Sequence, residues 1–286
     1  MIRRLSCCPP PGGSFGSLRF HLVTGLVVAV SLAATFHYCL SMAGGMDMPG
    51  DWRMSMMWMP MPGQSRLDSA LMFLSIWIAM MVAMMLPSLA AKLLLFYRSL
   101  VWKRAHHPGP STAMVAGGYF MVWTAVGAGV YALGFPWAMA TMTWPGLSRM
   151  VPFLTGLALV LAGAYQFGKW KREKLGRCRN LLVYGMAPKH PQKFNKKGEL
   201  LPEIIEDAGL WASLVVGLQQ GLSCVVCCAG SMVVLVALGA MNLYVMLAVA
   251  MVIALEKLLP NPKPVLYMTG SFAIGLGTVM VIRSLF

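Results

Sequence analysis

The chain has 286 residues, of which 58% are hydrophobic and 11% are charged, and its formal net charge is +14. Soluble domains carry about 25% charged residues, so this composition excludes an ordinary soluble domain and indicates an integral membrane protein. The basic residues lie between apolar runs rather than on one folded face. This distribution favours membrane topology over nucleic-acid binding.

Seven apolar runs approach or exceed the length of about 20 residues that a bilayer-spanning helix needs. A basic tail at residues 1–19, which we expect to be flexible, precedes a membrane domain at residues 20–286. The expected spans are 20–42, 67–94, 113–138, 151–167, 210–238, 242–259 and 265–282. The sequence therefore predicts an all-α fold, a polytopic transmembrane helix bundle of about seven spans, with six to eight as the range.

Lysine and arginine are divided unequally between the two expected sides. With the N-terminus inside, 19 basic residues fall on the inner side and four on the outer side. The positive-inside rule thus predicts a cytoplasmic N-terminus and a basic cytoplasmic loop at residues 168–209.

The expected outer loop, residues 43–66, is rich in methionine. Thioethers bind Cu(I) without losing a proton, so we interpret this loop as a collector of copper on the outer side. Methionine also fills gaps in apolar cores, but a loop rich in proline and glycine is expected to have no core to fill. The candidate ligands here are Met46, Met48, Met54, Met56, Met57, Met59 and Met61.

The span at residues 67–94 continues the methionine pattern. Met80 and Met84 are four residues apart, as are Met81 and Met85, so they form two adjacent pairs on a helix. A ligand role and ordinary packing by flexible side chains both remain open for these four residues.

Three cysteines lie together in the span at residues 210–238. Cys224, Cys227 and Cys228 are spaced i, i+3 and i+4, which places three soft sulfurs on one face of a helix. Such ligands suit Cu(I), with Zn(II) as the second candidate. The neighbouring Gln219 and Gln220 strengthen the prediction, because polar groups in the hydrocarbon region pair with one another or mark a site.

Two further candidate ligands lie in the first span. At a helical rise of about 1.5 Å per residue, His37 and Cys39 would lie in the outer half of the membrane. The cysteines of the span at 210–238 would lie at a similar depth, below the methionine loop. The alternatives are an interfacial hydrogen-bonded histidine and a small buried thiol. Glu256 is expected to be an interfacial anchor beside Lys257.

Five motifs occur in a characteristic order. They are AMMVAMMLPS at 79–88, LAGAYQ at 161–166, GLQQGLSCVVCC at 217–228 followed by Met232, GAMN at 239–242 and ALEKL at 254–258. Together they resemble a family of bacterial membrane proteins described as predicted metal-binding integral membrane proteins. The resemblance covers about residues 70–280 and implies metal binding, without a reaction or a transport direction. A bacterial inner membrane is the expected location.

The chain departs from the family's usual Cys-Leu-Gly-Cys-Cys-Trp pattern. Val225 and Val226 lie between the cysteines, and Ala229 takes the place of the tryptophan. Of a second cysteine pair that the family tends to carry after the fourth span, only Cys178 matches, with Lys174 at the earlier position.

The sequence thus predicts a membrane protein that binds a soft metal ion, copper before zinc, for copper handling, delivery or transport. The expected partners are the bilayer, the metal ion, and another membrane protein or a second copy of the chain. We find no nucleotide-binding motif, which argues against an ATP-driven pump on this chain alone. An enzymatic role is the less favoured prediction. The alternatives are a membrane thiol oxidoreductase, with Cys224 and Cys227 as redox pair and Cys39 as resolving thiol, and an assembly subunit in which the cysteines only pack.

Overall fold

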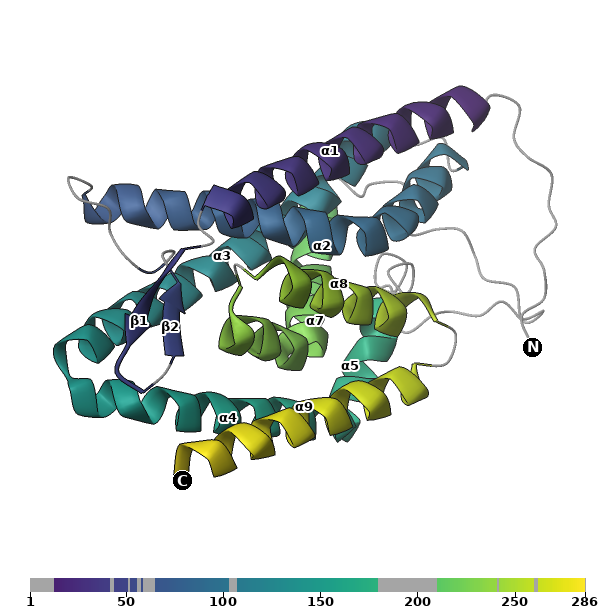
Figure 1. Ribbon diagram of the computed structural model, residues 1–286. Coiled ribbons are helices and arrows are strands. Elements are labelled where there is room, and N and C mark those ends of the chain that lie inside the picture. Colours follow the sequence, from purple (N-terminus) through teal and green to yellow (C-terminus); the bar gives the residue numbers. More distant parts are fainter. Residues whose placement is uncertain are drawn as a thin grey trace.

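The computed structural model describes most of the chain as helices with one small hairpin (Figure 1). It describes residues 13–41, 44–50, 52–55, 58, 65–102, 107–179, 210–240, 242–259 and 262–285. The helices are α1 (Gly13–Ser41), α2 (Arg66–Trp102), α3 (Pro108–Thr143), α4 (Pro145–Phe167), α5 (Lys169–Arg179), α7 (Leu210–Leu238), α8 (Leu243–Leu258) and α9 (Lys263–Leu285). The strands are β1 (Gly45–Met48) and β2 (Trp52–Ser55).

The predicted all-α bundle is confirmed. Six of the described helices, α1, α2, α3, α4, α7 and α9, are long and apolar enough to cross a membrane. The expected span at 242–259 corresponds to α8, which has 16 residues and is shorter than a bilayer-spanning helix of about 20 residues. Six candidate spans lie at the lower end of the predicted range. The expected cytoplasmic N-terminus and the division into tail, membrane domain and loops stay predictions.

Helix α7 lies at the centre of the bundle. It contacts α3, α4, α5 and α8, while α1 packs on α2 and α9 packs on α4 farther out (Figure 1). The mostly apolar α1 is exposed along most of its length, whereas much of α7 is buried. The helix that carries the cysteines is therefore among the most enclosed elements of the fold.

Glycines allow α3 and α7 to touch through their backbones. A Cβ atom at Gly118 would lie 2.5 Å from the carbonyl oxygen of Leu214, and one at Gly217 would lie 2.2 Å from that of Val115. Small residues permit this close approach between apolar helices, where dispersion contacts supply much of the attraction. The α4–α9 contact uses the same device, with Gly156 against Gly277 and Gly163 against Gly270.

The methionine-rich segment begins as a hairpin. Strands β1 and β2 pair antiparallel, with Met46 opposite Met54 and Met48 opposite Trp52, and Gly50 in the turn has φ +106°. These four side chains share one face of the hairpin, because paired residues and alternate residues of a strand point to the same side.

The expectation that this segment has no core to fill is wrong. Met48 and Met54 are buried and pack with Ala138 of α3. The Trp52 indole also donates a hydrogen bond of 3.0 Å to the Ser148 carbonyl oxygen, which ties the hairpin to α4. Packing thus explains part of the methionine content here.

Substitution of Gly118 by alanine tests the α3–α7 contact. The added methyl group would meet the α7 backbone, and overpacking of this kind typically costs about 1–3 kcal/mol. We expect Gly118→Ala to lower the thermal unfolding temperature in detergent. The neighbouring Gly117→Ala is the control, because nothing lies within 4 Å of a Cβ there. Equal unfolding temperatures for the two variants would contradict the close packing.

Candidate metal centre

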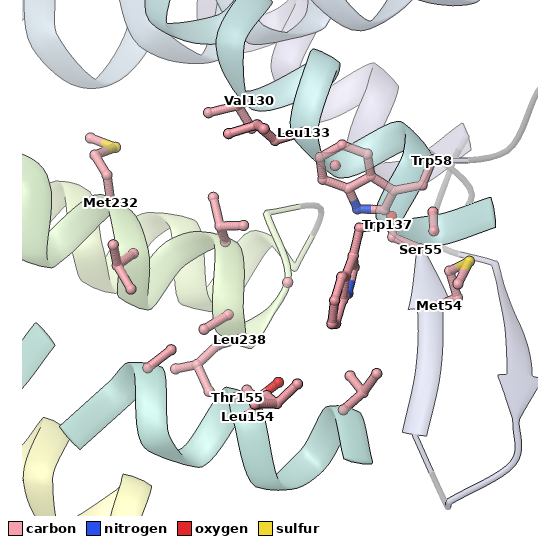
Figure 2. A pocket seen from close by; sticks show the side chains of 18 of the residues that line it. Met54, Ser55, Trp58, Val130, Leu133, Trp137, Leu154, Thr155, Met232 and Leu238 are labelled. Atoms are coloured by element: carbon pink, nitrogen blue, oxygen red, sulfur yellow. The ribbon is translucent and has the colours of Figure 1, made fainter. Parts of the chain in front are cut away.

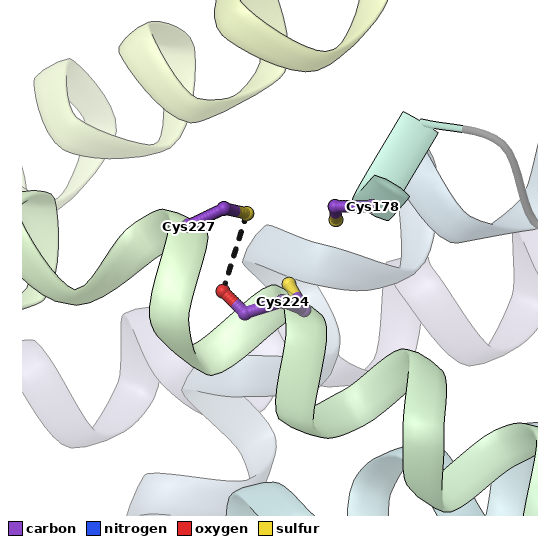
Figure 3. A group of neighbouring side chains, drawn as sticks. All are labelled: Cys178, Cys224 and Cys227. Atoms are coloured by element: carbon purple, nitrogen blue, oxygen red, sulfur yellow. Dashed lines mark hydrogen bonds between the residues drawn. The ribbon is translucent and has the colours of Figure 1, made fainter. Parts of the chain in front are cut away.

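Three buried cysteine sulfurs from α5 and α7 form one group, and a fourth lies against two of them. The Sγ atoms of Cys178, Cys224 and Cys227 all lie within 4.8 Å of one another (Figure 3). Cys228 Sγ lies 3.8 Å from Cys224 Sγ and 3.5 Å from Cys227 Sγ. All four residues are at most 1% exposed, and none of them forms a disulfide.

Helix α7 supplies three of the thiols through its helical period. Cys227 and Cys228 lie one turn beyond Cys224, so the three side chains share a face, as the spacing predicts. The Cys227 thiol also donates to the Cys224 carbonyl oxygen at 3.3 Å (Figure 3), as polar side chains in a helix commonly do toward the preceding turn.

Helix α5 supplies the fourth thiol. Lys171, Leu175 and Cys178 are spaced by four and three residues, so they lie on one face, and all three are buried. Lys171 Nζ lies 3.0 Å from both carboxylate oxygens of Glu256 on α8, and it also donates to Gln166. This buried ion pair fixes α5 against the bundle.

Two side chains bind the C-terminal end of α5. The Cys178 carbonyl oxygen accepts hydrogen bonds from Gln220 Nε2, at 2.7 Å, and from Lys92 Nζ. Carbonyl groups in the last turn of a helix lack an intrahelical partner, and a cation there also complements the helix dipole. The position of Cys178 is therefore set by contacts to α2 and α7 as well as by the ion pair.

Cys224 has the most polar surroundings of the four thiols. Its sulfur accepts a hydrogen bond of 2.9 Å from the Tyr119 hydroxyl group of α3. Lys257 Nζ of α8 lies 3.1 Å from the same sulfur and 3.2 Å from Met85 Sδ of α2. Side chains of α3 and α8 thus contact this thiol of α7, and Met85 of α2 contacts the lysine beside it.

The sulfur positions fit a soft metal ion. With metal–sulfur bonds of about 2.3 Å, sulfurs around one ion lie about 4 Å apart, close to the separations between Cys228 and its two neighbours. Among the described residues, no histidine or carboxylate joins the group. An all-sulfur, enclosed set favours Cu(I), Zn(II) or a cluster over hard cations.

The cysteines must lose protons when a metal binds, because thiolates are the ligands. The hydrogen bond to Cys224 is the largest cause that raises the pKa of the Cys178 thiol above its ordinary value, and burial also raises it. Metal binding at this cysteine would therefore release a proton and weaken as the pH falls.

The predicted ligands fall into two separate groups. Met80, Met81, Met84 and Met85 are buried in the same core cluster as the α7 cysteines. In the hairpin, Met48 and Met54 are buried and Met46 is 46% exposed. Met56, Met57, Met59 and Met61 lie outside the described residues.

The two candidates in α1 lie apart from the cysteine cluster. His37 is exposed and contacts the Tyr38 ring. Cys39 is buried, but it packs with Ile76 in a small cluster of its own. Neither residue joins the group of four thiols.

The structure corrects one expectation about burial, and the expected depth of the cysteines in the membrane stays a prediction. Helix α5 follows the expected inner end of α4 and brings Cys178 to Cys224 and Cys227. Glu256 is not an interfacial anchor, because it is 1% exposed and paired with Lys171.

Sequence reasoning missed three residues of the site. The family pattern includes a cysteine at position 178, but Lys174 replaces the second cysteine of that pair, so the sequence did not identify Cys178 as a ligand. Lys257 had a usable signal, since a charged residue within an apolar span usually marks a functional or paired position. Tyr119 had no such signal, because nothing in the neighbouring sequence indicates which tyrosine contacts a thiol.

A cavity of about 880 Å³ separates the hairpin from α7 (Figure 2). Met54 and Trp58 lie at the hairpin end and Met232 lies on α7, with Trp137 between them in this view. The α7 wall also includes Val225 and Ala229, which are direct sequence neighbours of Cys224 and Cys228. The cavity therefore extends from the methionine hairpin to the helix that bears the thiols.

The fold and the site define a class of protein: an apolar helix bundle with an enclosed, all-cysteine candidate metal centre. Comparison with protein families agrees with this class. The family described as PpoB2, copper chaperone, matches residues 74–280, and the chain belongs to that family. No curated protein and no solved structure matches the chain. The match supports the predicted metal-binding family.

Replacement of Cys178 by serine tests whether α5 contributes to the metal centre. Loss of one of four soft donors should weaken Cu(I) or Ag(I) binding by about tenfold or more, since even indirect ligand contacts are worth 10–100-fold. Competition with a chromogenic Cu(I) chelator in detergent measures this change. Cys39→Ser is the matched control, because Cys39 is buried but lies in another cluster. Native affinity in Cys178→Ser would remove Cys178 from the ligand set.

Proposed function

We propose that this chain is a membrane copper chaperone that binds Cu(I) through Cys178, Cys224, Cys227 and Cys228 and passes it to a membrane-protein partner. The single observation that carries the proposal is the cluster of four buried sulfurs without a described hard ligand. The family description, copper chaperone, supports the same metal.

Burial of the cluster suits transfer of a protected ion. A Cu(I) ion bound to thiolates inside an apolar bundle is shielded from water, and thiolates are soft donors that suit this soft ion. Each thiol that binds gives up its proton, so loading and release are coupled to proton movement. Cu(I) is the expected cargo, with Zn(II) as the weaker candidate.

Entry from the hairpin side is supported by the cavity in Figure 2. Met46 and Met54 are paired across the hairpin, and Met54 lines the cavity that leads toward α7. Thioethers exchange Cu(I) without proton transfer, which suits a first collecting position. In this proposal, Met232 receives the ion on the α7 side before the thiols bind it.

We further propose that the protein lies in a bacterial inner membrane with its N-terminus inside. The six long apolar helices support insertion into a membrane. The unequal distribution of basic residues supports the orientation. In that arrangement the hairpin faces the outer side and α5 the cytoplasm, so the partner that accepts copper would bind near α5.

Burial of the thiols disfavours the alternative of a thiol oxidoreductase. Thiol–disulfide exchange with a substrate protein needs an accessible thiolate, whereas the four cysteines are at most 1% exposed. The resolving thiol expected from the sequence, Cys39, lies in a separate cluster.

Metal analysis of the purified protein tests the proposal. We expect the native chain, loaded under reducing conditions, to retain Cu(I), and Cys224→Ser/Cys227→Ser/Cys228→Ser to lose it. Mass spectrometry of bound metal gives the stoichiometry, and thiol titration of the native chain checks for disulfides. Equal copper in both proteins would support a purely structural role of the cysteines. A disulfide that turns over without metal would support the oxidoreductase instead.

The entry side is tested by removal of the hairpin sulfurs. Met46→Leu/Met48→Leu/Met54→Leu keeps the apolar volume but removes three thioethers. We expect slower loading of Ag(I), a redox-inert analogue of Cu(I), with an unchanged final stoichiometry, because the thiols set the equilibrium. A time course of metal retained after resin treatment measures the rate. Met268→Leu, at an exposed position of α9, is the control. An unchanged rate would exclude the hairpin from the route.

A further inference from the structure

Lys257 places a buried ammonium group directly against the sulfur cluster. The residue is 6% exposed and lies in the last turn of α8. Its Nζ atom is 3.1 Å from Cys224 Sγ and 3.2 Å from Met85 Sδ. One cation thus contacts both a candidate metal ligand and a thioether of α2.

The neighbouring carboxylate does not neutralise this cation. Glu256 points to Lys171, whose Nζ lies 3.0 Å from both of its carboxylate oxygens. That pair balances its own charge and leaves Lys257 as an additional positive charge. A second cation, Lys92, donates to the Cys178 carbonyl oxygen at another edge of the cluster.

Apart from Glu256, the described titratable groups around Lys257 are thiols and a phenol rather than carboxylates. Cys224, Cys228, Cys178 and Tyr119 interact with it electrostatically. Glu256 also does so, although its carboxylate oxygens pair with Lys171. No carboxylate belongs to the cysteine group within the described part of the chain. Lys257 therefore adds a positive charge at the edge of the sulfur cluster.

A fixed positive charge discriminates between ions by their charge. The repulsion between the ammonium group and a bound ion is proportional to the ion's charge, and it is stronger in a buried site than in water. For the same set of sulfur ligands, a divalent ion is repelled twice as strongly as a monovalent one. Softness alone does not separate Cu(I) from Zn(II) or Cd(II), because thiolates bind all three.

We propose that Lys257 is the specificity-determining residue that restricts the four-cysteine site to monovalent soft ions, Cu(I) and Ag(I), against Zn(II) and Cd(II). This inference rests on the proposed function, because it assumes that the cysteines bind metal. Lys257 acts here as a positioned charge beside the ligands and not as a ligand itself.

Three variants separate the charge of Lys257 from its size and its hydrogen bonds. Lys257→Gln keeps a hydrogen-bond donor without the charge, Lys257→Leu removes both, and Lys257→Arg keeps the charge. Lys263→Gln is the control, because it removes a lysine charge at an exposed position of α9. Thermal unfolding in detergent identifies a variant that does not fold. If one of the two uncharged variants fails to fold, the other still provides the test.

The measurement is the ratio of Ag(I) to Cd(II) affinity, determined by competition for each purified protein. We expect Lys257→Gln and Lys257→Leu to lower this ratio by about tenfold or more. Lys257→Arg and Lys263→Gln should keep the native ratio. A purely structural role would weaken both ions equally and leave the ratio unchanged, which would overturn the inference. Failure of the native chain to bind either ion would instead overturn the proposed function.

Discussion

Backbone contact between α3 and α7 is the constraint on which the cysteine cluster depends. Gly118 and Gly217 allow the two helices to touch, since a side chain at either position would meet a carbonyl oxygen at 2.5 Å or less. Tyr119 follows Gly118 directly, and its hydroxyl group reaches Cys224 at 2.9 Å. Helix association without a strong hydrophobic driving force relies on such close packing. The thiols are therefore enclosed because Gly118 and Gly217 have no side chains that would hold α3 and α7 apart.

Buried charge fixes the second half of the site. Lys171 and Glu256 tie α5 to α8, and a buried pair of this kind strongly favours the arrangement in which both partners stay together. The same turn of α8 then presents Lys257 to Cys224. Two consecutive residues thus have separate tasks: one holds the helix that carries Cys178, and the other sets the charge beside the sulfurs.

Much of the fold could be predicted from the sequence, but the methionine segment shows where such prediction stops. Long apolar runs indicate helices because hydropathy and length are local properties. The same reasoning treated residues 43–66 as an open loop with no core. The hairpin turns at Gly50, which has a positive φ. Met48 and Met54 then pack against Ala138 of α3, which is about 90 residues away in the sequence. Local composition could not predict that contact.

The sequence by itself determined the apolar helices and the shared face of Cys224, Cys227 and Cys228, because helical spacing fixes which side chains lie together. Only the tertiary structure decided which groups from other helices meet that face. That face is met by Cys178 of α5, Tyr119 of α3 and Lys257 of α8, and Met85 of α2 contacts Lys257. Their meeting depends on glycine contacts and buried polar pairs between helices, which are properties of packing and not of any single span.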